Sequence, residues 1–181
     1  MKFRFGIATL VLAAATVLAG CAAPQPTDYA AERPVLSLQS YFNGRLQAHG
    51  MFQNRAGKVV KRFTVEMNCS WTGDQGVLDE AFTYSDGTTG RRVWKLQALA
   101  DGRFTGTADD VVGVAQGEQR GNAFQWTYTL RQPVDDKVYE VQMDDWMYLV
   151  DNKVMLNRAE MSKFGVRVGE VTLSFTKLGQ P

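Results

Sequence analysis

Apolar and polar side chains alternate along most of the chain. In the segment FTVEMNCSW, residues 63–71, every second position is apolar and the positions between them are polar. A period of two places successive side chains on opposite faces of a β-strand. The same period recurs in the segments LDEAFTY, RRVWKLQA, AFQWTYTL and VTLSF. No long stretch shows the 3.6-residue period of an amphipathic helix, so the pattern predicts an all-β protein.

Turn-forming sequences separate the alternating segments. They include SDGTTG, ALADG, GEQRGN, PVDDK and VDNK, which are rich in Gly, Asn and Asp. Their spacing predicts about eight to ten strands joined by hairpins, an arrangement that favours an antiparallel up-and-down meander. Closure of such a sheet removes its exposed edges, so the fold we predict is an antiparallel up-and-down β-barrel. A β-sandwich, or a split barrel with one open side, is the alternative.

The first residues have the layout of a secretory signal peptide. Two basic residues precede an apolar run over residues 5–18, and the run ends in the letters LAGC. This ending fits the bacterial lipobox, so we expect cleavage before Cys21 and attachment of lipid to its sulfur and new amino terminus. The run is shorter than the roughly 20 residues that a membrane-spanning helix needs.

Lipidation sets the expected location and the domain limits. Aspartate directly after the lipidated cysteine is the common signal for retention at the inner membrane, and Ala22 stands there instead. We therefore expect the outer membrane of a Gram-negative bacterium, with the protein facing the periplasm. The predicted domains are a lipoprotein signal peptide at 1–20, a lipidated N-terminus and flexible tether at 21–35, and the β-barrel at 36–181. The tether contains three of the five prolines.

Composition argues against several kinds of chemistry. Removal of residues 1–20 takes away two of the 20 basic residues and none of the 19 acidic ones, which leaves a formal charge of −1. This balance gives no electrostatic reason to expect nucleic acid as a partner. A single histidine cannot build a multi-histidine metal site, and no glycine-rich phosphate loop or nucleophile elbow is present. We therefore expect no metal and no cofactor.

Cys69 and His49 formally supply the two side chains of a nucleophilic dyad. Cys69 falls on the apolar face of its strand, where burial raises the pKa of a thiol, so we interpret it as a core residue. His49 is expected to face outward. With Cys21 lipidated, Cys69 has no partner for an internal disulfide.

Adjacent carboxylates stand in the segment DDWMYLVDNKVMLNR, residues 144–158. Neighbours on a strand point to opposite faces, so Asp144 and Asp145 cannot act as a catalytic pair. Asp145 shares the apolar face of its strand. A two-residue or four-residue turn after this strand would place Asp145 opposite Arg158, near enough for a charge-assisted contact.

Glu80 and Arg92 form a second such pair, on the apolar faces of sequential strands. Buried charges cost free energy unless they are paired, so both pairs are interpreted first as internal salt bridges that fix the strand register. In a second interpretation, Arg92 or Arg158 binds the carboxylate or phosphate of an amphiphile. The tail of this molecule would lie against Trp94, Trp126 and Met147. In a third, a carboxyl group of one pair has a shifted pKa and acts as a catalytic acid.

Several sequence blocks together resemble a known family. They are LQSYFNGRLQAHGMFQNRAG, KRFTVEMNCSW, LDEAFTYSDG, RRVW, GTADDVVGVAQGEQRGNAFQWTY, DDWMYLVDNKVMLNRAEMSKFG and GEVTLSF. Their combination is similar to the bacterial lipoproteins that contain domain of unknown function 3833, over about residues 38–177. The resemblance implies a lipocalin-like barrel and a lipid-related setting, because members often lie near genes for fatty-acid modification. It supplies no catalytic residues.

These features predict an outer-membrane lipoprotein whose periplasmic barrel binds or carries a lipid or another small apolar molecule, such as a fatty acid or a phospholipid. A structural or partner-binding envelope lipoprotein with a filled barrel is one alternative. A cofactor-free lipid-modifying enzyme is the other. The membrane is the expected partner, through the lipid anchor, and the oligomeric state is left open.

Overall fold

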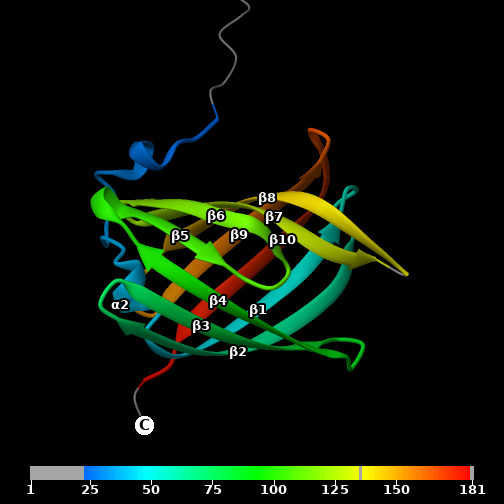
Figure 1. The fold of residues 1–181 in the computed structure, drawn as a ribbon, viewed down its shortest axis with the longest axis horizontal. Helices are drawn as coiled ribbons and strands as arrows, with labels where there is room; N and C mark the ends of the chain where they lie inside the picture. The colour runs from blue at the N-terminus through cyan, green and yellow to red at the C-terminus, as the bar shows by residue number, and fades with distance from the viewer. Residues whose placement is uncertain (1–22, 135, 180–181) are drawn as a thin grey trace, which may run out of the picture.

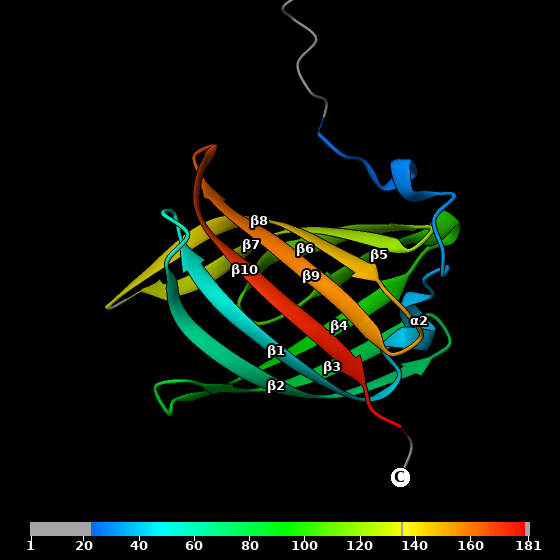
Figure 2. The ribbon, with the colours of Figure 1, turned by 180° about the vertical axis from the view of Figure 1, so that it is seen from behind.

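The computed structural model of the chain, which describes residues 23–134 and 136–179, is a closed β-barrel of ten antiparallel strands. Each strand pairs with the next along the chain, and pairing of the last strand with the first closes the sheet (Figures 1 and 2). The predicted all-β, up-and-down barrel is therefore confirmed. The strands are β1 (Gly44–Asn54), β2 (Val59–Thr72), β3 (Gln75–Tyr84), β4 (Thr89–Ala98), β5 (Arg103–Thr107), β6 (Val111–Arg120), β7 (Ala123–Val134), β8 (Lys137–Leu149), β9 (Val154–Lys163) and β10 (Val166–Lys177).

Alternating burial shows which side chains of each strand face the interior. On β2, every second residue from Phe63 to Cys69 is buried, and the residues between them are exposed. This is the face that the period-two pattern predicts, and the inward faces predicted for β3 and β7 agree as well. Cys69 is buried with a pKa raised to about 12, chiefly by burial, while His49 is exposed, so both predictions are confirmed.

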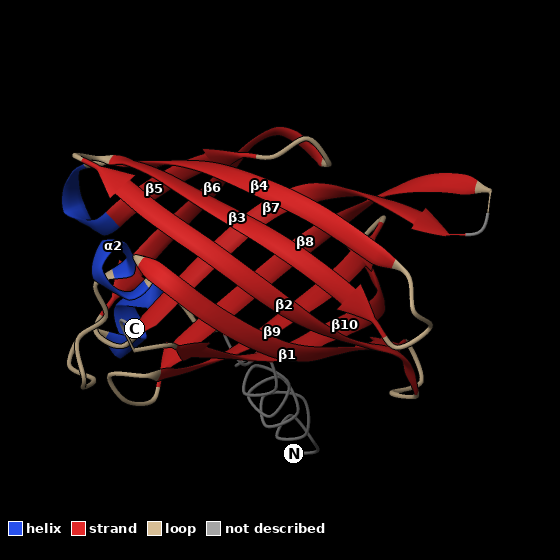
Figure 3. Cartoon of the chain, turned by 90° about the horizontal axis from the view of Figure 1, so that it is seen from below, coloured by secondary structure: helices blue, strands red, loops and turns tan. Residues whose placement is uncertain are grey.

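A short helix, α2 (Leu38–Tyr41), closes one end of the barrel, at the left of Figure 3. Phe42 follows it, is only 2% exposed, and meets the ring of Phe175 edge to face with 5.3 Å between centroids. The Tyr41 hydroxyl donates to the backbone carbonyl of Phe175 at 3.2 Å, and the Trp71 indole N–H donates to the carbonyl of Phe42 at 2.9 Å. These contacts make α2 a fixed floor beneath the barrel interior.

The N-terminal segment that leads to α2 lies against the outer wall of the barrel. It contains a 3-10 helix, η1 (Pro26–Tyr29), and the ring of Tyr29 lies 5.7 Å from that of Trp146 and 5.3 Å from that of Tyr148. Gly121, at φ +51°, allows this approach, because a Cβ atom there would lie 1.7 Å from the Tyr29 carbonyl oxygen. The described part of the predicted tether is therefore packed against the barrel, which differs from the flexible segment expected.

Several predictions concern residues outside the described part of the chain. The signal peptide at 1–20 and the lipidation site Cys21 belong to this group. Within residues 23–134 and 136–179, no helix is long and apolar enough to cross a membrane. All ten strands lie between residues 44 and 177, so a chain that starts at residue 22 retains the complete hydrogen-bonded sheet.

The end of the barrel opposite α2 is formed by five hairpin connections (Figures 1 and 3). The four connections at the α2 end, one of which contains η2 (Ala100–Gly102), lie close to the barrel. The β7–β8 and β9–β10 hairpins at the opposite end extend beyond the barrel body (Figures 1 and 2). Phe164, at the tip of β9–β10, is 91% exposed. We call the α2 end the closed end and the opposite end the open end.

Candidate functional site

A cavity of about 1070 Å³ occupies the barrel from α2 to the open end. Its floor includes Leu38 and Phe42, and residues near its mouth include Val60, Val134 and Lys163. Sites for small molecules and cofactors commonly enclose roughly 300 to 1,000 Å³ and are mostly apolar with a few placed polar groups. The barrel is therefore hollow, with the size and lining of a binding site.

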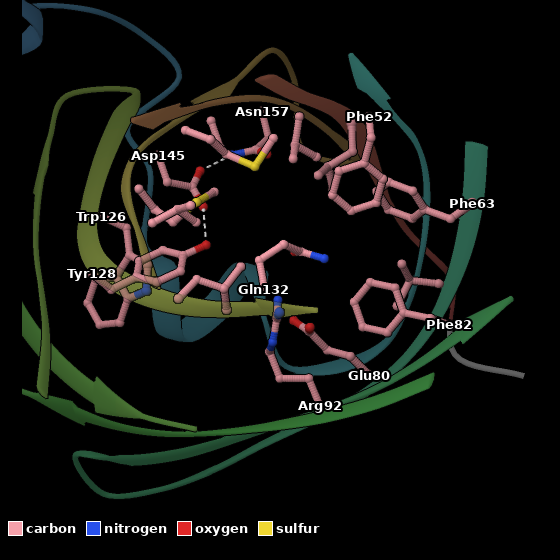
Figure 4. A pocket seen from close by; sticks show the side chains of 18 of the residues that line it. Phe52, Phe63, Glu80, Phe82, Arg92, Trp126, Tyr128, Gln132, Asp145 and Asn157 are labelled. Carbon is pink, nitrogen blue, oxygen red and sulfur yellow. Dashed lines mark hydrogen bonds between the residues drawn. The ribbon is translucent and has the colours of Figure 1, made fainter. Parts of the chain in front are cut away.

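Aromatic side chains form two groups on facing walls of the cavity. Trp94 and Trp126 meet edge to face with 5.6 Å between ring centroids, and Trp94 meets Tyr128 in the same way at 5.3 Å. Gly117 makes room for this group, because a Cβ atom there would lie 2.2 Å from the Trp126 ring. Across the cavity, a second aromatic group faces the first (Figure 4). Its members are Phe52, Phe63, Phe82 and Tyr84.

Glu80 and Arg92 stand opposite each other on β3 and β4, as predicted, and both line the cavity. The Arg92 guanidinium does not form a salt bridge with Glu80. Its Nε and Nη2 atoms donate to the carboxylate of Asp110, with the shortest distance 2.6 Å between Nη2 and Oδ2. Arg92 also lies over the ring of Phe82, 5.8 Å from its centroid. The predicted neighbourhood of Glu80 and Arg92 is confirmed, but the partner of the arginine is Asp110.

Asp145 is the second carboxyl group in the cavity and comes from β8. Asn157 of β9 donates its amide N–H to Asp145 Oδ1 and to the backbone carbonyl of Trp146, the latter at 3.0 Å. The Tyr128 hydroxyl donates to Asp145 Oδ2 at 3.4 Å. Figure 4 draws the two hydrogen bonds to Asp145, and Glu80, Arg92 and Gln132 lie on the other side of the space. Asp145 is thus held by neutral donors.

Burial alters the acidity of both carboxyl groups. It raises the pKa of Glu80 to about 7, and the positive charge of Arg92 offsets only part of this effect. It also raises the pKa of Asp145 to about 6, against the lowering effect of the hydrogen bonds from Asn157 and Tyr128. The raised pKa values distinguish these two groups from ordinary surface carboxylates, which titrate at about pH 4.

The predicted pairing of Asp145 with Arg158 is wrong. Leu149 pairs with Met155 and not with Val154, so the register of β9 against β8 differs by one residue from the predicted one, and Asp145 stands opposite Ala159. A shift of one residue moves every side chain of the second strand to the other face. Asn157 therefore points into the cavity, and Arg158 points outward with a side chain that is 65% exposed.

Arg158 takes part in a separate cluster on the outer wall. It donates to Glu170 at 2.7 Å, and Arg167 donates to the same carboxylate at 3.0 Å. The hydrogen bond from Arg158, followed by that from Arg167, lowers the pKa of Glu170 although this residue is only 8% exposed. This cluster is a paired, structural one, and Arg158 does not contribute to the cavity.

Sequence reasoning missed four polar residues of the site, namely Asp110, Tyr128 as a hydrogen-bond donor, Gln132 and Asn157. Tyr128 was placed on the correct face, but alternation does not show which carboxylate its hydroxyl meets. Asp110 lies in the connection before β6, where the strand pattern gives no direction. Among the described residues, no group of three or more His, Cys, Asp and Glu is arranged to hold a metal ion.

Comparison with known proteins identifies the family. The model of the family described as "Protein of unknown function (DUF3833)" matches residues 15–177. The chain belongs to this family. The resemblance predicted from the sequence blocks is therefore confirmed. Among curated proteins, none matches the DUF3833 chain by sequence.

Two solved structures share the barrel of this DUF3833 protein. One is the S-type phycobiliprotein lyase CPES from Guillardia theta, with 8% identity and a TM-score of 0.61 over 87% of this chain and 100% of that one. The other is a DUF3598-family protein of unknown function from Nostoc punctiforme, with 11% identity and a TM-score of 0.55. That match covers 82% of this chain and 51% of the other, so the DUF3833 chain spans about half of it. At these identities the similarity shows the fold, which is lipocalin-like.

Proposed function

We propose that this protein is an outer-membrane lipoprotein whose barrel binds or carries a lipid or another small apolar molecule in the periplasm. The observation that carries the proposal is the aromatic-lined cavity of about 1070 Å³, with a small set of polar groups between its floor and its mouth. The similarity to a protein described as a phycobiliprotein lyase supports a barrel that accommodates a small molecule. The hollow interior does not favour the alternative of a filled barrel.

The proposed location depends on the N-terminal sequence. The lipobox ends at Cys21 and is followed by Ala22, which favours the outer membrane. Several acyl chains on one cysteine give stable anchoring, because each buried methylene contributes about 0.8 kcal/mol. Replacement of Cys21 by Ser is expected to leave the protein unlipidated and absent from the membrane pellet. Membrane-bound protein of mature size in this variant would contradict the anchor.

Native mass spectrometry of residues 22–181, purified from its own periplasm, tests the binding function directly. A stoichiometric adduct that is recovered by organic extraction and identified as a lipid is the expected result. Protein that carries no adduct and yields no extractable lipid would instead assign the function to the outer surface of the barrel. A Trp126→Leu variant, which removes the indole from the cavity wall but keeps an apolar side chain, is expected to retain less of the adduct.

A second candidate is a cofactor-free enzyme that acts on the same lipid. It is favoured by one observation, the two buried carboxyl groups of Glu80 and Asp145 with raised pKa values in the cavity. The test is incubation of the purified protein with the molecule recovered by extraction, followed by mass analysis of that molecule. A change of mass that Glu80→Gln abolishes would establish catalysis, and recovery of the molecule unchanged would leave binding as the function.

A further inference from the structure

The carboxyl groups inside the cavity retain acceptor capacity that no charged donor of the described residues fills. The carboxylate of Glu80 points into the cavity and receives no hydrogen bond from the described residues, although its side chain is only 9% exposed (Figure 4). The oxygens of Asp145 accept from Asn157 and Tyr128, two neutral donors. Glu80 is accessible from the cavity, and a bound molecule that fills the cavity would shield its oxygens from water. A shielded acceptor without a donor costs free energy comparable to a lost hydrogen bond, so Glu80 favours a bound group that donates.

Most donors deep in the cavity already have a carboxylate partner. Arg92 directs Nε and Nη2 to Asp110, while Tyr128 and Asn157 donate to Asp145. The Nη1 atom of Arg92 makes no hydrogen bond with the described residues, but an incoming carboxylate or phosphate that used it would have to compete with Asp110 for the same guanidinium and would face Glu80 on the neighbouring strand. This situation differs from a site with a free arginine, in which an acid meets no competing carboxylate.

Burial is the largest cause of the raised pKa of Glu80, and the charges inside the barrel add to it more than they offset it in number. Arg92 on β4 lowers the pKa, whereas Asp110 before β6 and Asp145 on β8 raise it; Asp79, on the outer face of β3, is the last and weakest of the contributors. Lys61 and Lys163 line the cavity near its mouth, at the ends of their strands. If the acidic group of a lipid bound these lysines, its hydrocarbon tail would lie against Glu80 and Asp145. This contact is unfavourable because the tail offers neither carboxyl group a hydrogen bond.

We infer that the polar end of the bound molecule is an uncharged or cationic hydrogen-bond donor, such as an alcohol, an amide or an amine, and that it lies between Glu80 and Asp145. The inference rests on the proposed function. It reverses the expectation that an arginine binds an acidic headgroup, because Arg158 is outside the barrel and Arg92 is held by Asp110. A free fatty acid is thus a poorer ligand than the alcohol or amine with the same tail.

Displacement of the uncharged fluorescent probe 1-N-phenylnaphthylamine from residues 22–181 tests this inference. The competitors are hexadecanol, hexadecylamine and palmitate, which share a sixteen-carbon tail and differ at the polar end. At pH 8 we expect the alcohol and the amine to compete about tenfold more strongly than palmitate, since one unpaired buried group corresponds to a factor of that order. Glu80→Gln and Asp145→Asn are expected to reduce this preference, because an amide can donate as well as accept.

Asp79→Asn is the matched control, since Asp79 precedes Glu80 on β3 but forms a surface ion pair with Arg91. It should leave the preference unchanged. Palmitate competing as strongly as hexadecanol at pH 8 would overturn the inference while leaving lipid binding intact. Failure of the probe and of all three competitors to bind would contradict the proposed function itself.

A separate observation concerns the outer surface of the open end. The β1–β2 and β9–β10 hairpins are adjacent because β1 pairs with β10, and Arg167 donates to the backbone carbonyl of Arg55 across them at 3.5 Å. We call residues 55–60 and 163–168 the basic rim. Its exposed apolar side chains are Val59, Val60, Phe164, Val166 and Val168.

Charge is unevenly distributed around the open end. The basic rim contains Arg55, Lys58, Lys163 and Arg167 and no acidic residue. The β3–β4 and β5–β6 connections on the other side of the mouth carry Asp86, Asp109 and Asp110 instead. Exposed apolar side chains flanked by basic ones are typical of proteins that bind the interface of an anionic bilayer.

We propose that the basic rim binds the surface of a bilayer that contains anionic phospholipid, with Phe164 entering the interface. Two features of the structure support a lipid surface as the partner. The rim borders the mouth of the apolar cavity, to which Val60, Lys163 and Val168 also belong. In addition, the described chain begins on the side of the barrel toward which the β9–β10 hairpin rises, so an N-terminal anchor and the rim can reach one membrane (Figures 1 and 2).

Co-sedimentation of residues 22–181 with vesicles tests the rim without the anchor. Vesicles of phosphatidylethanolamine and phosphatidylglycerol are expected to bind the protein, and phosphatidylcholine vesicles to bind it about tenfold less, with the difference decreasing at high salt. Phe164→Ser and the double variant Lys58→Gln, Lys163→Gln should each lower binding about fivefold or more. The matched controls are Leu99→Ser and Arg103→Gln, at the closed end, which should bind as the unmodified protein does.

Equal binding of the rim variants and the closed-end controls would overturn this proposal, as would the absence of binding to anionic vesicles. Size-exclusion chromatography with light scattering measures the molar mass of the protein and shows whether it forms a dimer. A dimer that Phe164→Ser dissociates, together with no vesicle binding, would assign the rim to a second copy of this chain and remove the bilayer as its partner.

Discussion

The two ends of the barrel use similar residues in opposite ways. At the closed end, Phe42 and its neighbours on α2 are almost completely buried and form the floor of the cavity. At the open end, Phe164 is 91% exposed at the tip of a hairpin. Both are phenylalanines next to the same cavity, but only Phe42 gains from removal of its ring from water. Burial of an aromatic ring thus closes one end of the barrel, and the other end leaves access to the interior.

This difference explains how a barrel can remain hollow and still fold. A closed sheet satisfies its own backbone hydrogen bonds, so the open end needs no core to hold the strands together. The closed end supplies a compact apolar group in which α2, β2 and β10 meet. The middle of the barrel, where Glu80 and Asp145 lie, is then free to be polar.

The largest effect is expected from Phe42→Ala. Truncation of a fully buried aromatic residue lowers the free energy of unfolding by about 3 to 5 kcal/mol, through lost burial and the space left behind. The matched change at the open end, Phe164→Ala, should stay within about 0.5 kcal/mol. Urea denaturation of both variants measures the difference. Similar midpoints for the two would remove the contrast between the ends.

A smaller effect is expected from Glu80→Gln, and it should depend on pH. The folded-state pKa of Glu80 is raised from 4.5 to about 7, so its contribution to stability is fully present below pH 4.5 and is lost as the pH rises through 7. The glutamine variant has no such loss. Its free energy of unfolding, relative to that of the unmodified protein, should therefore rise by up to about 3 kcal/mol between pH 4.5 and pH 8. Asp145, raised to about 6, titrates in the same direction in both proteins.

Denaturation midpoints of the two proteins at several pH values check this expectation. Glu170 provides a comparison, because it is equally buried but paired with Arg158 and Arg167, and its pKa is lowered. Its contribution is present above its unfolded pKa and is lost as the pH falls through the lower folded value. The difference in stability between a Glu170→Gln variant and the unmodified protein should therefore become smaller as the pH falls. The difference between Glu80→Gln and the unmodified protein should become larger as the pH rises. Parallel pH profiles would contradict both assignments.

The face of its strand to which a side chain points could be predicted from the sequence, because successive residues alternate between the two faces. The inward positions of Glu80, Arg92, Trp94, Trp126 and Asp145 follow from alternation alone, and all five line the cavity. Closure of the barrel followed from the succession of hairpin turns.

The pairing across a turn could not be predicted in the same way. In the β8–β9 connection, the Asp151 side chain accepts hydrogen bonds from the backbone N–H groups of Lys153 and Val154, both at 2.7 Å. The loop that contains this local bonding pairs Leu149 with Met155 instead of Val154, and alternation contains no information on the register across a turn. A simple turn therefore places Arg158 inside the barrel, where the structure has Asn157.

Burial of Trp146 is another feature that local pattern could not reveal. Trp146 points to the outer face of β8, where alternation predicts exposure, but its side chain is only 7% exposed. The covering residue is Tyr29, more than a hundred positions away in the chain. A segment rich in proline was expected to be a tether, and the aromatic residue within it gave the only sign of packing.

The smallest effect is expected from Tyr29→Ala, which tests whether this N-terminal segment shortens the link to the membrane. If Cys21 carries the anchor, packing from Pro26 onward leaves five residues, or roughly 17 Å when fully extended, where a free tether to residue 35 would reach about 50 Å. Loss of the Tyr29 ring removes its contacts with Trp146 and Tyr148. We expect about 1 kcal/mol less stability and faster amide exchange over residues 23–34, with exchange in β3 and β4 unchanged. Slow exchange that persists in the variant would mean that the backbone bond from the Leu36 N–H to the Gly121 carbonyl, 2.8 Å, holds the segment without the ring.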